Sequence, residues 1–404
     1  MGEEPTDLFR SLTVLSLEQA MALPFLTMRL AQEGMRVIRV EAPPRGDPNR
    51  WVGASVLPLP DGGGGEQGMG SYFLPNNLGK QAITLNLATA GGQAVLRRMI
   101  RELPVDVFAT NLRPRSYRKL GIDEASLRSL RPELIWLGIT GFGPDHDEAA
   151  YDPILQARAG FMDLTGEPGG DPMVFGLPMA DLGAAEHAYG QVMRALAVRT
   201  ATGRGERIDL SMYQSAVSWL ATPVMLAKSF GETVTRRGNT HPFFAPVSVY
   251  PTQDGHVYLA VGNDRQWEAL TQMRGFQELA RSEYAVNAGR IERVLELNLE
   301  LAALTRQWSA PALIAECGAA GVPVSRVYSV REVCQDTLLD GQFIRARDER
   351  SGVEICLPPP PVVPDYLRKQ GMTMDFPPRL GEHNAQVYGG LGLDLAALEQ
   401  EGTI

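Results

Sequence analysis

The sequence predicts an α/β fold with a doubly wound parallel sheet, because strand and helix patterns alternate through its first third. LTVLSL (12–17) and VIRVE (37–41) have the apolar, β-branched composition of buried strands, and a small-residue helix pattern over 20–34 separates them. A strand, a crossover helix and a second strand form a right-handed parallel unit, and repeating it places helices on both faces of the sheet. Three further strands and one further helix are predicted at 82–87, 105–111, 134–143 and 91–103.

The chain changes character after about residue 205. A strand pattern at RIDLS (207–211) leads into an apolar run that predicts one long helix. A hairpin is predicted around Asp254-Gly255, because this dipeptide is a common two-residue turn between strands. Helices are expected across 264–320 and a strand over 322–330. The chain therefore contains a large α/β domain, a smaller inserted domain and a C-terminal return.

Composition excludes several classes of protein. The chain of 404 residues has a formal net charge of −9, which argues against general nucleic-acid binding, since that requires a surplus of cations. The sequence has no run of eighteen apolar residues that would predict a membrane span. Its three cysteines are far apart and its five histidines lack zinc-site spacing, so we expect a cytoplasmic protein with no metal.

Common nucleotide-binding and hydrolase motifs are absent. The first predicted strand is followed by EQAMALP, which contains no glycine, whereas a nicotinamide site would require GxGxxG there. The glycine run at 62–65 follows no predicted strand and is interpreted as a mobile loop. Neither a Walker-type loop nor a GxSxG nucleophile elbow occurs in the sequence.

A series of short segments instead resembles one family when the segments are taken in order. Each is weak alone, but together they extend from about residue 10 to 395 and are specific. On them the sequence resembles the family III CoA-transferases, typified by formyl-CoA:oxalate and carnitine CoA-transferases. The segments are RVE-x5-GDPNR, N77-x2-GK, D106-x4-NLRP, KLGI, GITGFG-x7-YDPILQARAG-x4-TG, ADLGAAEHA, RTATGRGERIDLSM, RRGNTHP and LGEHN.

The resemblance implies covalent catalysis by an aspartate, and Asp181 matches the family's nucleophile. The carboxylate attacks a donor acyl-CoA such as succinyl-CoA to give a mixed anhydride, and the thiolate returns to form an aspartyl-CoA thioester. A carboxylic acid acceptor then collects CoA through a second anhydride, which divides one hard step into several easier ones. CoA is a substrate here, and the chemistry requires no metal and no tightly bound cofactor.

The setting of Asp181 allows two roles. It is expected just before a helix, where a carboxylate commonly caps the helix, so a purely structural role is the alternative to a nucleophile. The same position predicts that amide N–H groups and the helix dipole favour the ionised form. Gly183, Ala184 and Ala185 follow, and their small size is expected to leave room for an acyl group.

The resemblance also assigns substrate-binding positions. The patch NLRPRSYRKLG is cationic and could hold phosphates through Arg113 and its neighbours, or could be a solvated helix start. Arg39, Arg45 and Arg50 could add to this field. Met21 falls where the formyl-CoA enzyme has a glutamine beside the reacting acyl group, and Gln19 could supply a hydrogen bond there or be an ordinary helix-start residue. The residues that match CoA contacts are Leu85, Asn111, Leu112, Lys119 and Tyr151, and alanines replace frequent basic residues at Ala42, Ala88 and Ala149.

Two other functions stay open. Racemases of the same fold move a proton at the α-carbon, but they have a histidine where this chain has Tyr151, and a phenol with a pKa near 10 is a poor base at neutral pH. Alternatively, the chain could be the supporting subunit of a heteromeric CoA-transferase. An apolar acyl pocket including Met21, Leu23 and Phe25 is a further expectation, although such residues also form ordinary cores.

The resemblance implies a homodimer, or a heteromer with a related subunit, whose chains interlock like two links. Each chain would contain a Rossmann-like large domain and a smaller α/β domain that covers the site. No nucleic acid or membrane is expected as a partner. The predicted parts are a large CoA-binding domain at 1–200 plus 346–404, linkers at 201–225 and 325–345, and a small domain at 226–324.

Overall fold

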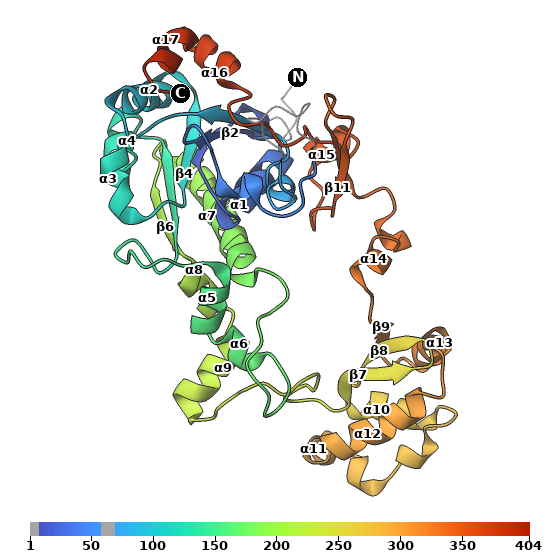
Figure 1. The fold of residues 1–404 in the computed structure, drawn as a ribbon. Coiled ribbons are helices and arrows are strands. Elements are labelled where there is room, and N and C mark those ends of the chain that lie inside the picture. Colours follow the sequence, from blue (N-terminus) through green and yellow to red (C-terminus); the bar gives the residue numbers. More distant parts are fainter. Residues whose placement is uncertain (1–7, 58–68) are drawn as a thin grey trace. The chain divides into compact units, whose positions relative to one another are not determined.

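The computed structural model describes residues 8–57 and 69–404, so the glycine run at 62–65 lies outside the described residues. The chain forms two compact units, each described by itself below (Figure 1). The first contains Met1–Ala159, Phe175–Met225 and Leu339–Ile404, and the second contains Gly160–Val174 and Leu226–Leu338. In the described part of the chain, no helix is long and apolar enough to cross a membrane.

The first unit is built on a six-stranded parallel sheet in the order β3-β2-β1-β4-β5-β6, which confirms the predicted α/β class. The strand order places β1 beside β4, so the chain extends in one direction through β2 and β3 and in the other through β5 and β6. The strands are β1 Thr13–Leu17, β2 Arg36–Glu41, β3 Lys80–Thr84, β4 Val105–Thr110, β5 Ile135–Thr140 and β6 Arg207–Ser211.

Helices cover both faces of this sheet, because alternate strand residues point to opposite sides (Figure 1). Val14, Val107 and Leu137 pack into the core beneath α1 (Ala22–Gln32) and α7 (Met179–Thr202). Leu15, Phe108 and Trp136 pack into the opposite core. That core is covered by α2 Ala90–Glu102, α3 Tyr117–Leu120, α4 Glu124–Leu130, α16 Asn384–Gly390 and α17 Leu395–Gln400.

The C-terminal return covers the open edge of β3. The backbone N–H of Ala82 donates to Nδ1 of His383 at 3.2 Å, and that of Thr84 donates to Oδ1 of Asn384 at 2.9 Å. The buried hydroxyl of Tyr388 donates to the Thr84 carbonyl at 2.6 Å. These side chains replace a seventh strand, so the edge cannot pair with another chain.

The rest of the first unit includes short helices and a hairpin. The predicted long helix after β6 is wrong, because α8 (Met212–Ser218) ends before α9 (Ala221–Met225) begins. Pro223 lies in α9 and lacks the N–H that a continuous helix would bond to Trp219. The other elements are α5 Asp152–Arg158, β10 Ile344–Arg347, β11 Glu354–Leu357 and α15 Asp365–Lys369.

The second unit contains an antiparallel sheet in the order β7-β8-β9, packed against helices around a core of its own. The predicted hairpin at Asp254-Gly255 is confirmed, since β7 (Val247–Thr252) pairs with β8 (Gly255–Ala260). The predicted strand over 322–330 shortens to β9 (Val324–Arg326), because Ser329 caps a helix in place of continuing the strand. The helices are α6 Phe161–Leu164, α10 Asp264–Gln272, α11 Asn287–Glu292, α12 Val294–Thr305, α13 Ala310–Ala319 and α14 Val330–Val333, and Leu226–Phe230 forms a π-helical turn.

A buried network of charges joins the carboxyl ends of β1 and β2 to the first residue of β3. The Nζ of Lys80 lies 2.7 Å from Oε1 of Glu18, and Arg39 lies 3.1 Å from both Glu41 and Asp47. Arg50 binds Glu41 at 2.5 Å, which balances three carboxylates with three cations. Although burial opposes the charge, Arg39 and Arg50 lower the pKa of Glu41 to about 2.

Removing one cation from this network should strongly lower the free energy of unfolding. Arg39→Met would leave three buried carboxylates with two cations, and we expect a loss of about 3–5 kcal/mol in the free energy of unfolding. The matched control is Arg368→Met, which breaks an exposed pair with Asp365 and should cost about 0–1 kcal/mol. Urea denaturation measures both, and equal losses for the two variants would contradict a stabilising role for the network.

Candidate active site

Two cavities open at the carboxyl ends of the parallel strands of the first unit. The first has a volume of about 210 Å³ and lies over the ends of β1 and β2 and the segment after β3. Its lining includes Gln19, Leu85 and Leu112, three of the residues selected from the sequence. In doubly wound sheets ligands bind at this edge, where the strand order reverses.

The second cavity, of about 160 Å³, adjoins the first, since Gln19 and Leu112 line both. It lies over the ends of β1, β4 and β5 and reaches α7. The sequence-predicted residues that line it are Gln19, Asn111, Leu112, Arg113, Tyr151 and Asp181. The fold therefore brings these residues from four separate segments of the chain to one cavity.

The junction between β1 and α1 separates the two cavities and is held from two sides. Nδ2 of Asn111 donates to the Gln19 carbonyl at 2.7 Å, and Oδ1 of Asn111 accepts from the Gln19 N–H at 3.1 Å. The N–H of Ala20 donates to Asp47 at 3.4 Å. Ala20 has a φ of 62°, a left-handed conformation that costs energy for a residue with a Cβ. Asn111 and the charge network thus fix the backbone that carries Gln19.

Asp181 lies in the first turn of α7, so the prediction that it precedes the helix is wrong by three residues. The N-cap is Pro178, which has no side-chain acceptor. The N–H groups of Ala180 and Asp181 instead donate to Oδ2 of Asp152, at 2.7 and 3.2 Å. The N–H groups of Met179 and Leu182 donate to the carbonyls of Leu177 and Pro178. Every amide of the first turn is therefore satisfied without the Asp181 carboxylate.

The environment of Asp181 opposes its ionised form, contrary to the sequence-based prediction. Burial raises the pKa of Asp181, and the Asp152 carboxylate raises it further, to about 7. Within residues 8–57 and 69–404, the Asp181 carboxylate has no hydrogen bond and no ion pair. A carboxylate without partners in a cavity is available for reaction, and its raised basicity makes it a better nucleophile.

The small residues after Asp181 do not leave the space that was predicted for an acyl group. Ala184 and Ala185 are buried in the core beneath the sheet. A Cβ on Gly183 would lie 3.0 Å from the Trp219 ring, so this glycine admits the indole. Trp219 also donates from Nε1 to Nε2 of His187 at 3.1 Å. These residues pack α7 against α8 (Met212–Ser218) and the segment after it.

Some predicted binding residues lie elsewhere. Arg39 and Arg50 are buried in the charge network and cannot reach a ligand, so the suggestion that they add to the field is wrong. Lys119 is exposed on α3 and Met21 is half-buried at the start of α1, and neither lines the two cavities. Ala42 and Ala88 line the first cavity and Ala149 lines the second, which leaves both with few cations.

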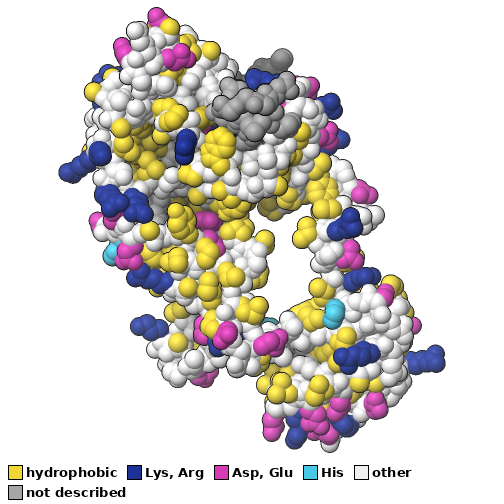
Figure 2. All heavy atoms as spheres, in the orientation of Figure 1, with side chains coloured by type: hydrophobic (Ala, Val, Ile, Leu, Met, Phe, Trp, Pro, Cys, Tyr) yellow, Lys and Arg dark blue, Asp and Glu magenta, His cyan; other side chains and the backbone are white. Residues whose placement is uncertain are grey.

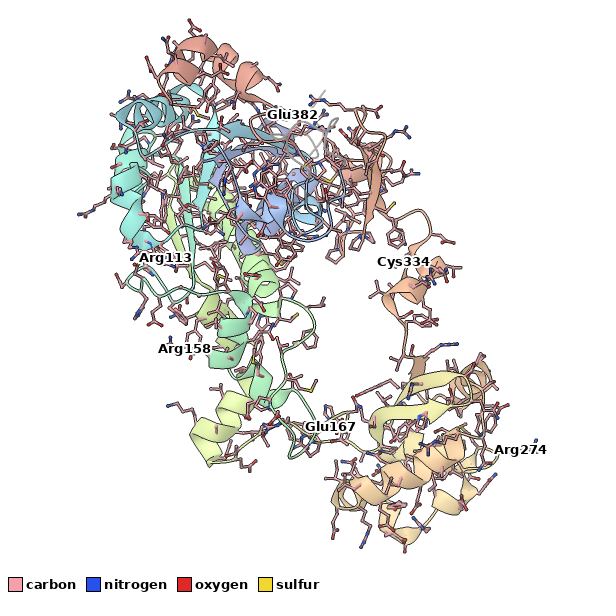
Figure 3. All side chains as sticks on the ribbon, in the orientation of Figure 1. Arg113, Arg158, Glu167, Arg274, Cys334 and Glu382 are labelled. Atoms are coloured by element: carbon pink, nitrogen blue, oxygen red, sulfur yellow. The ribbon has the colours of Figure 1, made fainter. Side chains whose placement is uncertain are left out.

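Arg113 is the arginine that lines the second cavity, near the start of α3 (Figure 3). It has no ion-pair partner among the described residues, whereas the neighbouring Arg115 binds Asp147 at 3.0 Å. Arg113 is also exposed, so its guanidinium can meet an anion without leaving a partner behind.

Three residues near Asp181 were missed from the sequence. Asp152 looks like an ordinary first residue of its own helix, and its contact with α7 depends on the fold. His146 lines the second cavity from the loop before α5. Burial raises the pKa of Tyr72, and the charges of Asp181 and Asp152 raise it further. The metal-binding clusters of three or more His, Cys, Asp or Glu that would suggest a metalloenzyme are absent from the described residues.

The sequence and fold together define the class of protein. The model of CoA-transferase family III matches residues 10–384, and the chain belongs to this family. A crystal structure of a CaiB/BaiF family protein from Brucella suis has a TM-score of 0.80 and 31% identity, over 96% of this chain and all of that one.

Curated relatives are enzymes that transfer CoA, and this chain is an enzyme of that class. It is 34% identical to a succinate–glutarate CoA-transferase of Agrobacterium fabrum, over 96% of each chain. It is 32% identical to a succinyl-CoA–D-citramalate CoA-transferase of Chloroflexus aurantiacus, over 97% of this chain and 96% of the relative. An acetyl-CoA:oxalate CoA-transferase of Acetobacter aceti is 33% identical, over 81% of this chain and 83% of the relative.

The raised pKa of Asp181 predicts a pH-dependent gain in stability when its charge is removed. Because the pKa of Asp181 is higher in the folded state than its ordinary value of 3.8, this carboxyl ionises more readily in the unfolded chain. The free energy of unfolding therefore falls as the pH rises from about 4 toward 7. Asp181→Asn should therefore be more stable than the wild type at pH 8, by about 1–3 kcal/mol after allowance for partial exposure. The difference should vanish near pH 4.

Urea denaturation at one protein concentration and several pH values measures this difference. Glu186→Gln is the control, because it removes an exposed carboxylate from the same helix. A difference between Asp181→Asn and the wild type that is constant from pH 4 to pH 8 would contradict the raised pKa.

Proposed function

We propose that this enzyme moves CoA from an acyl-CoA donor, such as succinyl-CoA, to a short dicarboxylate, with Asp181 as the covalent nucleophile. The observation that carries this proposal is that the Asp181 carboxylate lines a cavity and does not cap the helix on which it lies. A residue whose only role was to cap α7 would use its oxygens on the first-turn amides, but Asp152 occupies that position.

The proposed reaction has four steps, and in each step one bond to an acyl carbon forms while another breaks. An oxygen of Asp181 attacks the donor thioester carbon, the C–S bond breaks, and CoA thiolate leaves behind a mixed anhydride. The thiolate attacks the Asp181 carbonyl carbon and releases the donor carboxylate. The acceptor carboxylate attacks the resulting aspartyl-CoA thioester to form a second anhydride and thiolate. Attack of the thiolate on the acceptor carbonyl yields the new acyl-CoA and free Asp181.

The two adjoining cavities fit the two ends of a CoA thioester. The first is walled by apolar side chains, among them Leu85, Leu87 and Leu120, and suits an adenine ring. The pantetheine chain would pass Gln19 and Leu112, which the cavities share, and bring the thioester to Asp181. Arg113, and Lys119 beside Leu120, are the proposed cations for the phosphates. Tyr151 is 71% exposed, and its ring is proposed to pack against the pantetheine chain.

The proposed acceptor class rests on the names of the relatives. Those cited above act on glutarate, D-citramalate and oxalate, which are all dicarboxylates or hydroxylated dicarboxylates. Gln19, on its fixed backbone, is the proposed hydrogen-bond donor to the acyl group, with Met21 behind it at the start of α1.

An assembly of two interlocked chains is part of the proposal. Large apolar side chains are exposed on the segments proposed as connectors and just beyond, including Trp219 (45%), Phe230 (67%) and Val330 (81%). Hydrophobic side chains are also exposed over the first unit (Figure 2). Exposed apolar surface of this kind favours burial against a second copy or a related subunit.

The test of the function is a transfer assay with succinyl-CoA or acetyl-CoA and a panel of acids, read by mass spectrometry of the CoA products. The panel contains glutarate, citramalate, mesaconate, oxalate and benzylsuccinate. We expect transfer by the chain expressed alone, and a loss of at least about 1,000-fold in Asp181→Ala. Glu186→Gln, which lies on the same helix, should keep nearly full activity.

Two outcomes would overturn the proposal. Undiminished transfer by Asp181→Ala would remove the nucleophile, and no transfer by the chain alone would favour a supporting subunit. The same assay in D₂O tests the isomerase, because His146 provides the second cavity with a group able to move protons. Deuterium incorporation at the α-carbon of a 2-methylacyl-CoA would favour that function.

A further inference from the structure

The side chain of Asp152 accepts two hydrogen bonds from α7 and one from the helix that it begins. It is the first residue of α5 and is 6% exposed. Its Oδ2 accepts the N–H groups of Ala180 and Asp181, and its Oδ1 accepts from Nε2 of Gln156 at 2.5 Å. Gln156 in turn donates to the Leu177 carbonyl at 3.1 Å and accepts the Phe175 N–H at 3.0 Å. Asp152 and Gln156 therefore bind the first turn of α7 and the segment 175–177 that precedes it.

We infer that Asp152 is a positioning residue for Asp181: its carboxylate caps α7 from a neighbouring helix and places a second negative charge beside the nucleophile. The inference rests on the proposed function of Asp181. Capping fixes the backbone of Asp181 and leaves its side chain free. The neighbouring charge raises the energy of the ionised Asp181, so the carboxylate gains more on bonding to an acyl carbon.

The other charged or titratable groups around Asp181 come from separate segments. Tyr72 approaches from the segment before β3, and its pKa is raised by burial and by both aspartates. Arg113, His146 and Glu148 line the cavity from the loops after β4 and β5. Of the described groups, Asp152 is the one whose charge raises the pKa of Asp181, after the larger effect of burial.

Two variants separate the charge of Asp152 from its capping role. Asp152→Asn retains an oxygen that can accept the α7 amides but removes the charge, whereas Asp152→Ala removes both. For each, kcat/KM for the acyl-CoA is measured from pH 5 to pH 9 together with the melting temperature. The matched control is Glu148→Gln, which removes a carboxylate from the same cavity without touching α7.

The acidic limb of the profile should lie near pH 7 in the wild type, because ionised Asp181 is the nucleophile. In Asp152→Asn we expect this limb to move to lower pH by about half a unit to one unit, with a lower plateau. Asp152→Ala should show the same shift with a lower melting temperature, and Glu148→Gln should leave the limb in place.

The outcomes distinguish this inference from the proposed function. If Asp181→Ala is inactive but both Asp152 variants keep the wild-type acidic limb, Asp152 is only structural and the inference is overturned. The same holds if Glu148→Gln moves the limb as far as Asp152→Asn. If Asp181→Ala still transfers CoA, the proposed function fails and the inference fails with it.

Discussion

The hydrogen bonds from the first turn of α7 to Asp152 are the interaction on which the site depends. A helix start needs an acceptor for its free amides, and here the acceptor comes from another helix, 28 positions earlier than Ala180. This arrangement leaves the Asp181 carboxylate free of the helix amides. Its carboxylate faces the second cavity without a partner among the described residues, next to a like charge. The folded protein thus keeps a carboxylate whose ionised form is destabilised in the lining of a cavity, and reactive sites often have such groups.

The floor of the site has the opposite character. Beneath the first cavity, six charged side chains neutralise each other, and Phe73 lies against the guanidinium groups of Arg39 and Arg50 at 4.7 and 4.0 Å. Such a network is rigid because each partner has few alternatives in the interior. Through Asp47 it reaches the N–H of the strained Ala20, and Asn111 holds the preceding residue. The site therefore combines a fixed floor with the unpaired carboxylate of Asp181.

Much of the sheet could be predicted from the sequence, because the strands of a parallel sheet are buried on both faces and read as apolar runs. VIRVE is such a case, and β2 spans Arg36–Glu41. The site was less predictable, since it depends on contacts between distant segments. Arginines often bind phosphates, but Arg39 and Arg50 are buried and form ion pairs with carboxylates of the network. The role of Asp152 was hidden because an aspartate before a proline is an ordinary helix start. Asp181 itself was found through the resemblance, and local pattern alone would have made it a cap.

Peptide mapping of protein quenched during incubation with acyl-CoA, in the absence of an acceptor acid, tests the covalent role of Asp181 most directly. The peptide containing Asp181 should gain the mass of CoA less one water, through a thioester to that side chain. An unmodified Asp181 in protein that is exchanging CoA at the full rate would contradict it.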